Sequence, residues 1–324
     1  MKSKPSGYFR IFLFSLIGCL SFVLAPNTQA WGCKGHQTVA LIAEKHLTPE
    51  AKQLVDKLLS ENPADSKTGG YCGNSVHDAM ANAATWADDV RTQKKNGPWH
   101  YIDIPRGSKR DSLDKFCGEG GCVTKALSEQ LAILKDPNSN PAVRTDALRY
   151  VIHFVGDLHQ PLHAITNDDE GGNCVPLKYL RRKPHEHNNS YSPNLHSIWD
   201  TAILERDMEG ADPVEYANTL EEIFQADIAK WQKAPINVDD WVWESFDLAE
   251  NTVYEGLIPK IPVESPTPVQ SCTDDNNIGQ RMLLKNISVG ETYQVKAAQV
   301  SEKRVAQAGV RLAMILNQAA KPTE

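Results

Sequence analysis

The sequence predicts an all-α protein in which residues 31–324 form one mainly helical domain. Apolar residues recur at helical spacing along most of the chain, and clusters of Gly and Pro separate these stretches. No alternating strand pattern runs for more than a few residues. We therefore expect any β-sheet to be minor. The 294 residues of 31–324 suffice for a sizeable core and approach the upper size of a single domain.

Residues 1–30 are typical of a secretory signal peptide. A basic start is followed by an apolar run over residues 11–24 and by small residues at 28–30. This run is shorter than the roughly 20 residues that a membrane-spanning helix needs. We expect cleavage before Trp31 and a secreted or periplasmic protein without a membrane anchor.

The clearest early helix start is Thr48, a good N-cap residue, followed by Pro49 at the first helical position. This pattern predicts a helix that continues over residues 51–59. A second, apolar helix is predicted over residues 146–156. It should end near Gln160, because a proline disfavours the helical conformation in the residue before it.

The chain becomes polar and rich in Gly and Pro between residues 167 and 194, which indicates an excursion over the surface. A helix is predicted to resume near Ser197. The last predicted helix is long and rich in Ala and Val, and it covers residues 291–317.

After removal of the signal peptide six cysteines remain, an even number that fits disulfide bonding in an oxidising compartment. Cys117 and Cys122 flank a glycine-rich loop that can close on itself, so we predict that they pair. The pairing of the other four stays open. They are Cys33, Cys72, Cys174 and Cys272.

The charge balance excludes a generally basic nucleic-acid-binding surface. The whole chain has a net charge of −7, and without the three basic residues of the signal peptide it has 31 basic and 41 acidic residues, or −10. Any attraction for phosphate must therefore be local, and metal ions can provide it.

Two His-x3-Asp pairs carry the strongest chemical signal. His153 and Asp157 form the first, with His163 six residues later, and His196 and Asp200 form the second. Residues four apart on a helix point the same way, so each pair can bind one ion. Imidazole and carboxylate are the usual non-sulfur ligands of zinc. A single pair can be a surface ion pair, but two pairs within 50 residues favour a metal site.

Several motifs together resemble the S1/P1 family of zinc-dependent single-strand nucleases and 3′-nucleotidases, within the phospholipase C and nuclease superfamily. In order they are Trp31-Gly32-x2-Gly35-His36, Trp86-Ala87-Asp88-x2-Arg91, Trp99-His100-Tyr101-Ile102-Asp103, the segment His153 to His163, Gly171-Gly172-Asn173, and Asn194-Leu195-His196-x2-Trp199-Asp200. The resemblance runs across the chain from Trp31 and continues weakly to its end.

The resemblance implies a site with three Zn²⁺. The implied ligands are Asp88, His100 and His153 for the first ion; His36 with the amine and carbonyl of Trp31 for the second; Asp157 bridging these two; and His163, His196 and Asp200 for the third. Three ions and three carboxylates give a locally positive centre. An amine must lose its proton to bind zinc, so removal of the signal peptide would be an activation step.

The resemblance also implies hydrolysis of single-stranded DNA and RNA to 5′-phosphates, and removal of phosphate from 3′-nucleotides, by zinc-activated water. Asp157 and two further residues are implied in catalysis: Arg91 stabilises phosphoryl charge, and Asp103 orients or activates the water. Tyr101 is expected to stack on a base and Asn173 to contact the substrate. We expect a monomer.

Two alternatives remain open. A zinc-dependent phospholipase C shares the trinuclear site and an N-terminal Trp, although its last ligand is typically Glu, where this chain has Asp200. A non-catalytic zinc-binding protein needs only the ligands, and would leave Arg91 and Asp103 without a purpose.

Overall fold

The structure is a computed structural model, and it describes residues 31–64, 72, 76–187, 189–255, 257, 272–273 and 286–321. The predicted signal peptide lies outside these residues. The described helices are α1 (Cys33–Lys45), α2 (Pro49–Glu61), α3 (Ala79–Ala83), α4 (Trp86–Lys94), α5 (Val123–Lys135), α6 (Pro141–His159), α7 (Leu195–Ser197), α8 (Ile203–Asp207), α9 (Pro213–Ile223), α10 (Gln225–Trp231), α11 (Val238–Leu248) and α13 (Glu291–Ala319). This content confirms the predicted all-α class.

Short 3₁₀ and π turns connect several of these helices. The 3₁₀ turns are η1 (Gly97–His100), η2 (Leu113–Phe116) and η3 (Pro161–Ala164), and the π turns are η4 (Ile198–Ala202) and η5 (Ala249–Val253). Among the described residues the strands form two small pairs: β1 (Lys178–Tyr179) runs parallel to β4 (Ser288–Val289), and β2 (His185–His187) runs antiparallel to β3 (Ser190–Ser192). Sheet is minor, as predicted.

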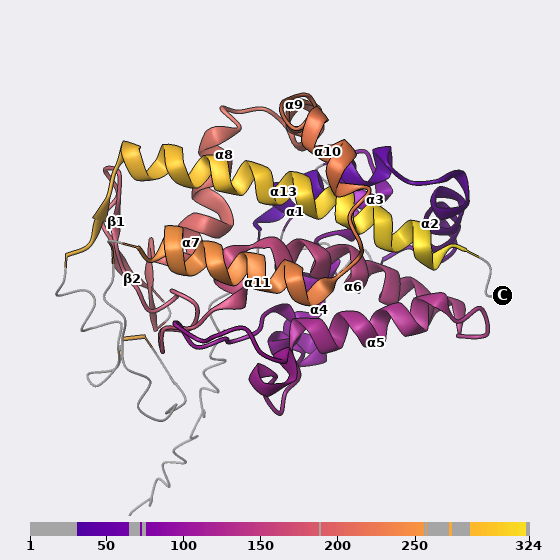
Figure 1. Ribbon diagram of the computed structural model, residues 1–324, viewed down its shortest axis with the longest axis horizontal. Helices are drawn as coiled ribbons and strands as arrows, with labels where there is room; N and C mark the ends of the chain where they lie inside the picture. Colours follow the sequence, from indigo (N-terminus) through magenta and orange to yellow (C-terminus); the bar gives the residue numbers. More distant parts are fainter. Residues whose placement is uncertain are drawn as a thin grey trace, which may run out of the picture.

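Helix α6 lies at the centre of the molecule (Figure 1), where it packs against α5, α13, α2, α11 and α4. Every residue from Ala147 to His159 is buried. The helix begins at Pro141, five residues before the predicted start, because the side chain of Asn140 accepts a hydrogen bond from the amide of Ala142 at 2.9 Å. It ends before Gln160, as predicted.

A helix resumes at Leu195 with α7, close to the predicted Ser197, and the predicted helices over 51–59 and 291–317 are present as α2 and α13 and extend slightly further. Thr48 caps α2, since its hydroxyl accepts from the amide of Ala51 at 3.3 Å. Helix α13 crosses the molecule beside α1 (Figure 1). A Cβ at Gly309 would lie 2.5 Å from the side chain of Ile42, so this glycine permits the close approach of the two helices.

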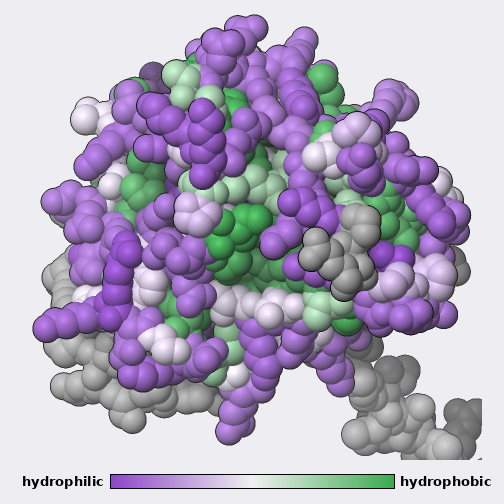
Figure 2. All heavy atoms as spheres, turned by 45° about the vertical axis from the view of Figure 1, so that its right-hand side comes forward, coloured by the Kyte–Doolittle hydropathy of each residue, from purple (hydrophilic) through white to green (hydrophobic). Residues whose placement is uncertain are grey.

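Three disulfides connect the described cysteines. Cys117 pairs with Cys122, which confirms the prediction, and the pairs left open are Cys33 with Cys72 and Cys174 with Cys272. No helix in the described part of the chain is long and apolar enough to cross a membrane. The face shown in Figure 2 is mainly hydrophilic, with hydrophobic residues visible between the polar side chains near its centre.

Candidate metal centre

The central helix α6 supplies two of the predicted ligands from successive turns. His153 and Asp157 are both fully buried, and the distance from His153 Nε2 to Asp157 Oδ2 is 3.3 Å. The helix ends at His159, and Pro161 starts the turn η3, which carries His163. The predicted pairing of these residues on one side of the helix is therefore present.

Three other elements bring further ligands to His153 and Asp157. Atom Nδ1 of His100, from η1, lies 3.0 Å from His153 Nε2 and 3.6 Å from Asp88 Oδ1 of α4. On the other side, Nε2 of His36 from α1 lies 3.4 Å from Asp157 Oδ1. These five residues form one group, which we call the paired cluster.

A glycine makes room for the ring of His36. The imidazoles of His36 and His153 stack with their centroids 4.0 Å apart. A Cβ at Gly156 would lie 2.7 Å from His36 Nδ1, so any larger residue there would displace the ring. The glycine in the predicted helix thus has a direct role in the site.

The remaining predicted ligands form a second group, the third-ion cluster, made of His163, His196 and Asp200. The Nε2 atoms of the two histidines are 3.2 Å apart, and His196 Nε2 is 3.2 Å from Asp200 Oδ2. Asp200 belongs to the π turn η4, and such turns occur often at functional sites. All three side chains are buried.

Backbone carbonyls determine which ring nitrogen of each histidine carries hydrogen. Atom Nδ1 of His153 lies 2.7 Å from the carbonyl of Ala84. Likewise, Nδ1 of His163 lies 2.7 Å from the carbonyl oxygen of His100, and Nδ1 of His196 lies 2.7 Å from the carbonyl oxygen of Gly171. Because a carbonyl can only accept, each Nδ1 donates, and the neutral rings of His163 and His196 present the lone pair of Nε2 to their cluster.

In the third-ion cluster these lone pairs face each other. Burial lowers the pKa of His163 to about 3 and that of His196 to about 4, so neither ring holds a second proton near neutral pH. Two Nε2 lone pairs 3.2 Å apart therefore repel each other unless a cation lies between them. The donor set and the carbonyls behind it fit a zinc ion.

The carboxylates of the two clusters have opposite pKa shifts. Burial raises the pKa of Asp200 well above its usual value. Burial also works against the charged form of Asp157, but His153 and the hydrogen bonds of the neighbouring histidines outweigh it and hold the pKa well below the usual range. In turn Asp157 and Asp88 outweigh the burial of His153 and raise its pKa to about 9.

Unsatisfied polar atoms collect in the paired cluster. Protein atoms give no hydrogen bond to these buried atoms: both ring nitrogens of His36, His100 Nε2, Asp88 Oδ1 and Asp157 Oδ1. Buried polar atoms nearly always have partners, and metal ions are among the partners they can have. This group therefore also fits a metal site.

The N-terminal residue of the described chain lies beside both groups. Trp31 is fully buried, and the amide of Gly32 donates to the backbone carbonyl of Asp200 at 2.6 Å. A Cβ at Gly35 would lie 2.7 Å from Trp31 Cβ, so α1 begins tightly against this residue. The segment from Trp31 to His36 thus connects the third-ion cluster to the paired cluster.

The predicted catalytic residues flank the clusters. Arg91 Nη1 lies 3.9 Å from Asp88 Oδ1, and its charge also disfavours protonation of His196. The side chain of Asp103 reaches solvent. Even so, the protein that surrounds it and the carboxylates of Asp169 and Glu170 raise its pKa to about 7.

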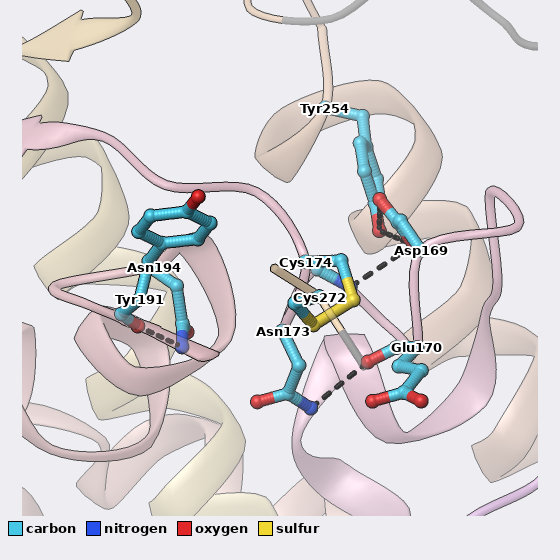
Figure 3. Close-up of a disulfide and its surroundings, with 9 residues drawn as sticks. Asp169, Glu170, Asn173, Cys174, Tyr191, Asn194, Tyr254 and Cys272 are labelled. Atoms are coloured by element: carbon cyan, nitrogen blue, oxygen red, sulfur yellow. Dashed lines mark hydrogen bonds between the residues drawn. A yellow bond between two sulfur atoms is a disulfide. The ribbon is translucent and has the colours of Figure 1, made fainter. Parts of the chain in front are cut away.

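The predicted substrate-binding residues lie close to the same carboxylates. Tyr101 is partly buried, and burial together with Asp103 raises its pKa to about 12. Asn173 Nδ2 donates to the carbonyl of Glu170 at 2.9 Å (Figure 3). The loop that carries Asn173 also contains Gly171, whose φ of +60° favours glycine.

Sequence reasoning missed the residues that hold the ligands. Gln160 Nε2 donates to Asp200 Oδ1. Buried Asp169 accepts from the hydroxyl of Tyr254 at 3.0 Å (Figure 3), and it also accepts from the amide of Gly172 at 3.0 Å. Gln160 lies inside the segment from His153 to His163, but no role was expected for it; Asp169 belongs to no motif, and backbone carbonyls have no sequence signal at all.

Two further groups of polar residues lie outside the clusters. His159, two residues after Asp157 on α6, contacts Arg311 at 2.9 Å and no member of the clusters. Glu170 lies close to Cys174 and Cys272, but these two sulfurs are bonded to each other and are not available to a metal.

Comparison with known proteins gives a consistent family. A family model described as S1/P1 Nuclease matches residues 31–321. The chain is 30% identical to Endonuclease 4 of Arabidopsis thaliana over 319 residues, which covers 91% of this chain and 90% of that protein. It is 29% identical to Nuclease S1 of Aspergillus oryzae over 312 residues, which covers 93% of this chain and 96% of that protein. It is 30% identical to Nuclease P1 of Penicillium citrinum over 204 residues, which covers 59% of this chain and 65% of that protein. The chain belongs to the S1/P1 nuclease family.

Proposed function

We propose that this protein is a zinc-dependent phosphoesterase that cuts single-stranded DNA and RNA to 5′-phosphate products and removes phosphate from 3′-nucleotides. Its family makes it a hydrolase of the endonuclease type. The observation that carries the zinc part is the approach of His163 Nε2 to His196 Nε2 at 3.2 Å, with both Nδ1 atoms on carbonyls.

The proposed ion content is three Zn²⁺. Asp88, His100 and His153 would hold the first ion, and His36 with the amine and carbonyl of Trp31 the second, with Asp157 shared between them. The third-ion cluster would hold the last. Nitrogen and carboxylate oxygen are suitable zinc donors, and the buried unpartnered atoms of His36, Asp88 and Asp157 support this assignment.

Use of the Trp31 amine requires a free N-terminus at this residue. We therefore propose that residues 1–30 are removed and that residues 31–324 form the mature domain, secreted or periplasmic and monomeric. Three disulfides support an oxidising destination. The burial of Trp31 and the bond from Gly32 to Asp200 support a position of this proposed terminus beside the clusters.

When bound, zinc supplies Lewis acidity and lowers the pKa of a bound water toward about 7. The chain itself positions substrate and handles protons. In this proposal Arg91 binds phosphoryl oxygens, and Asp103 orients the attacking water and accepts its proton. A base works best with a pKa near the working pH, and the pKa of about 7 at Asp103 suits that role.

Two side chains outside the clusters would select the nucleotide. The partly buried ring of Tyr101 offers a surface on which an unpaired base can stack. Asn173 has its amide nitrogen on the carbonyl of Glu170, which supports the proposal that its side-chain oxygen accepts a hydrogen bond from the substrate. A paired base cannot stack in this way, which would explain a preference for single strands.

The test is a substrate panel for the protein that begins at Trp31. Single-stranded DNA, RNA, a 3′-nucleotide and phosphatidylcholine are assayed on the sample whose zinc is counted, beside Asp157→Asn. Cleavage of nucleic acid and 3′-nucleotide, lost in the variant, supports the proposal. Phosphatidylcholine as the only substrate would indicate a phospholipase C, and zinc without turnover a zinc-binding protein.

A second sample tests the role of the terminus. A form that retains Ala30 before Trp31 should bind less zinc and lose activity, because a peptide nitrogen replaces the amine. Full zinc content and full activity in that form would refute the proposed ligand role of Trp31.

A further inference from the structure

The segment between the Gly171 loop and Asp200 is largely buried, contrary to the predicted surface excursion, and only the described residues between 181 and 189 are mainly exposed. Its charge is opposite to that of the rest of the protein. Residues 171–199 contain four basic side chains, Lys178, Arg181, Arg182 and Lys183, and one acidic side chain, Glu186. This stretch has a net charge of +3, whereas residues 31–324 as a whole have −10. We call residues 178–192 the basic hairpin, since they include β1, β2 and β3.

The charges of the basic hairpin are available for binding. Arg181, Arg182 and Lys183 are exposed. Within the described part of the chain none of these three forms an ion pair with an acidic side chain, whereas exposed cations elsewhere do, such as Arg206 with Glu291. A row of unpaired cations on an acidic protein favours an anionic partner by charge complementarity.

The base of the basic hairpin is attached to the third-ion cluster. The amide of Leu195 donates to the carbonyl of Val175 at 2.9 Å, and the amide of His196 donates to the carbonyl of Gly172 at 3.3 Å. The chain therefore leaves the site at the Gly171 loop and returns directly to the ligand His196. Arg182 is six positions after Pro176 at this base, so the chain between them spans no more than about 20 Å.

A second attachment holds the turn of the basic hairpin. The amide of Cys272 donates to the carbonyl of Asn189 at 3.1 Å, and Cys272 is bonded to Cys174. Cys174 follows Asn173, beside the predicted substrate contact (Figure 3). The basic hairpin is thus fixed at both ends relative to the site, and it can present its charges at a set distance.

We propose that the basic hairpin is a second contact surface for the phosphate backbone of a long single strand, several nucleotides away from the bond that is cut. This inference rests on the proposed nuclease function. Each basic side chain contacts a phosphate and releases a counterion from the strand. In this proposal a 3′-nucleotide or a dinucleotide bound at the metal centre does not extend to the hairpin, so only longer strands gain from it.

The test compares two triple variants with the same change in net charge. The hairpin variant is Arg181→Gln/Arg182→Gln/Lys183→Gln. The control is Lys57→Gln/Lys135→Gln/Lys233→Gln, which removes three exposed lysines from α2, α5 and the turn after α10. For each, kcat/KM is measured on a 3′-nucleotide and on oligothymidylates of 2 to 20 nucleotides at low and high salt.

The hairpin variant should lose about tenfold in kcat/KM on the 20-mer at low salt, and the slope of log kcat/KM against log salt should shrink by about 2. Its activity on the 3′-nucleotide and the dinucleotide should match wild type, and the control should stay within about twofold of wild type on all substrates.

Several results would overturn the inference. They are an equal loss of kcat/KM in both variants, an unchanged kcat/KM on the 20-mer in the hairpin variant, and a loss of kcat/KM that also affects the 3′-nucleotide.

Binding of a fluorescent 20-mer, followed by anisotropy, measures the contribution of the hairpin independently of turnover. A wild-type protein inert on every substrate would refute the proposed function, while unchanged 20-mer binding in the hairpin variant would refute the hairpin alone. Loss of binding to phosphatidylserine vesicles without loss of 20-mer binding would assign the surface to membranes and also overturn it.

Discussion

Helix α6 carries buried polar groups on two sides, and the two sides differ in how these groups are satisfied. On one side, His153 and Asp157 face atoms that protein hydrogen bonds leave without partners, including both ring nitrogens of His36. On the other side, His159 Nδ1 lies 2.7 Å from the carbonyl of Val155, and its Nε2 accepts from Arg311 at 2.9 Å. The same helix therefore has one unsatisfied and one satisfied polar side.

The satisfied side is a closed ionic network. Arg311 and Arg304 of α13 both bind Glu244 of α11, and Arg304 also donates to the carbonyl of His159 at 3.2 Å. Burial and these two arginines keep His159 neutral, since they hold its pKa well below the usual value. Burial of a polar group is thus not in itself a sign of function; the absence of a protein partner is the more informative sign.

The largest effect is expected from Asp157→Asn. The amide keeps the shape but removes the charge that the paired cluster needs, so kcat/KM on single-stranded DNA should fall about a thousandfold, or roughly 4 kcal/mol. Steady-state kinetics and zinc content measure this. His159→Gln, two residues further along α6, is the matched control and should keep both the zinc content and kcat/KM within about threefold.

The next effect is that of metal removal on stability. A ligand present at about a thousand times its dissociation constant contributes about 4 kcal/mol, so a chelator should lower the Tm by roughly 12 °C. Differential scanning calorimetry with and without chelator measures the shift. The shift should be much smaller in Asp157→Asn, and an equal shift in that variant would show that zinc stabilises the protein elsewhere.

A substitution on the satisfied side of α6 should lower the stability of the protein and leave its zinc content and activity unchanged. Arg304→Met removes a buried partner of Glu244 and of the His159 carbonyl, and it should lower the free energy of unfolding by about 3 kcal/mol. Urea unfolding measures this loss. Zinc content and kcat of the folded protein should stay near wild type, and a loss of zinc would contradict the separation of the two sides.

A smaller effect concerns pH and Asp103. Its pKa is raised to about 7, so between about pH 4 and pH 7 the folded state keeps a proton that the unfolded state loses, and stability falls as the pH rises. Because this side chain is exposed, the contribution is about 1 kcal/mol after solvent screening. Asp103→Asn should remove this fall. The check is the Tm of chelated wild type and variant at pH 4.5 and pH 7.5; parallel curves would contradict the assignment.

The sequence predicted those parts of the site that depend on local spacing. The pairs His153 with Asp157 and His196 with Asp200 follow from helix geometry, and the pair Cys117 with Cys122 follows from a short loop. The other site residues came from resemblance, because residues as distant as Asp88 and His153 give no local signal of contact.

Other features could not be predicted, for physical reasons. The carbonyls that orient His163 and His196 belong to residues of any type, so no residue identity reports them. The pairing of Cys174 with Cys272 closes 98 residues, and only the fold brings these two together. The start of α6 was placed late because its first turn, from Pro141 to Arg144, lies before the continuous apolar run and is mostly exposed.

The zinc content of the purified protein that begins at Trp31 tests the central claim most directly. It is measured by mass spectrometry of the metal alongside cleavage of single-stranded DNA, for wild type and for His196→Ala. The account predicts three zinc ions per active wild-type chain and two in the variant, which should have greatly reduced activity. A wild-type protein that cleaves nucleic acid at full rate without zinc, or a variant that retains three ions, would contradict it.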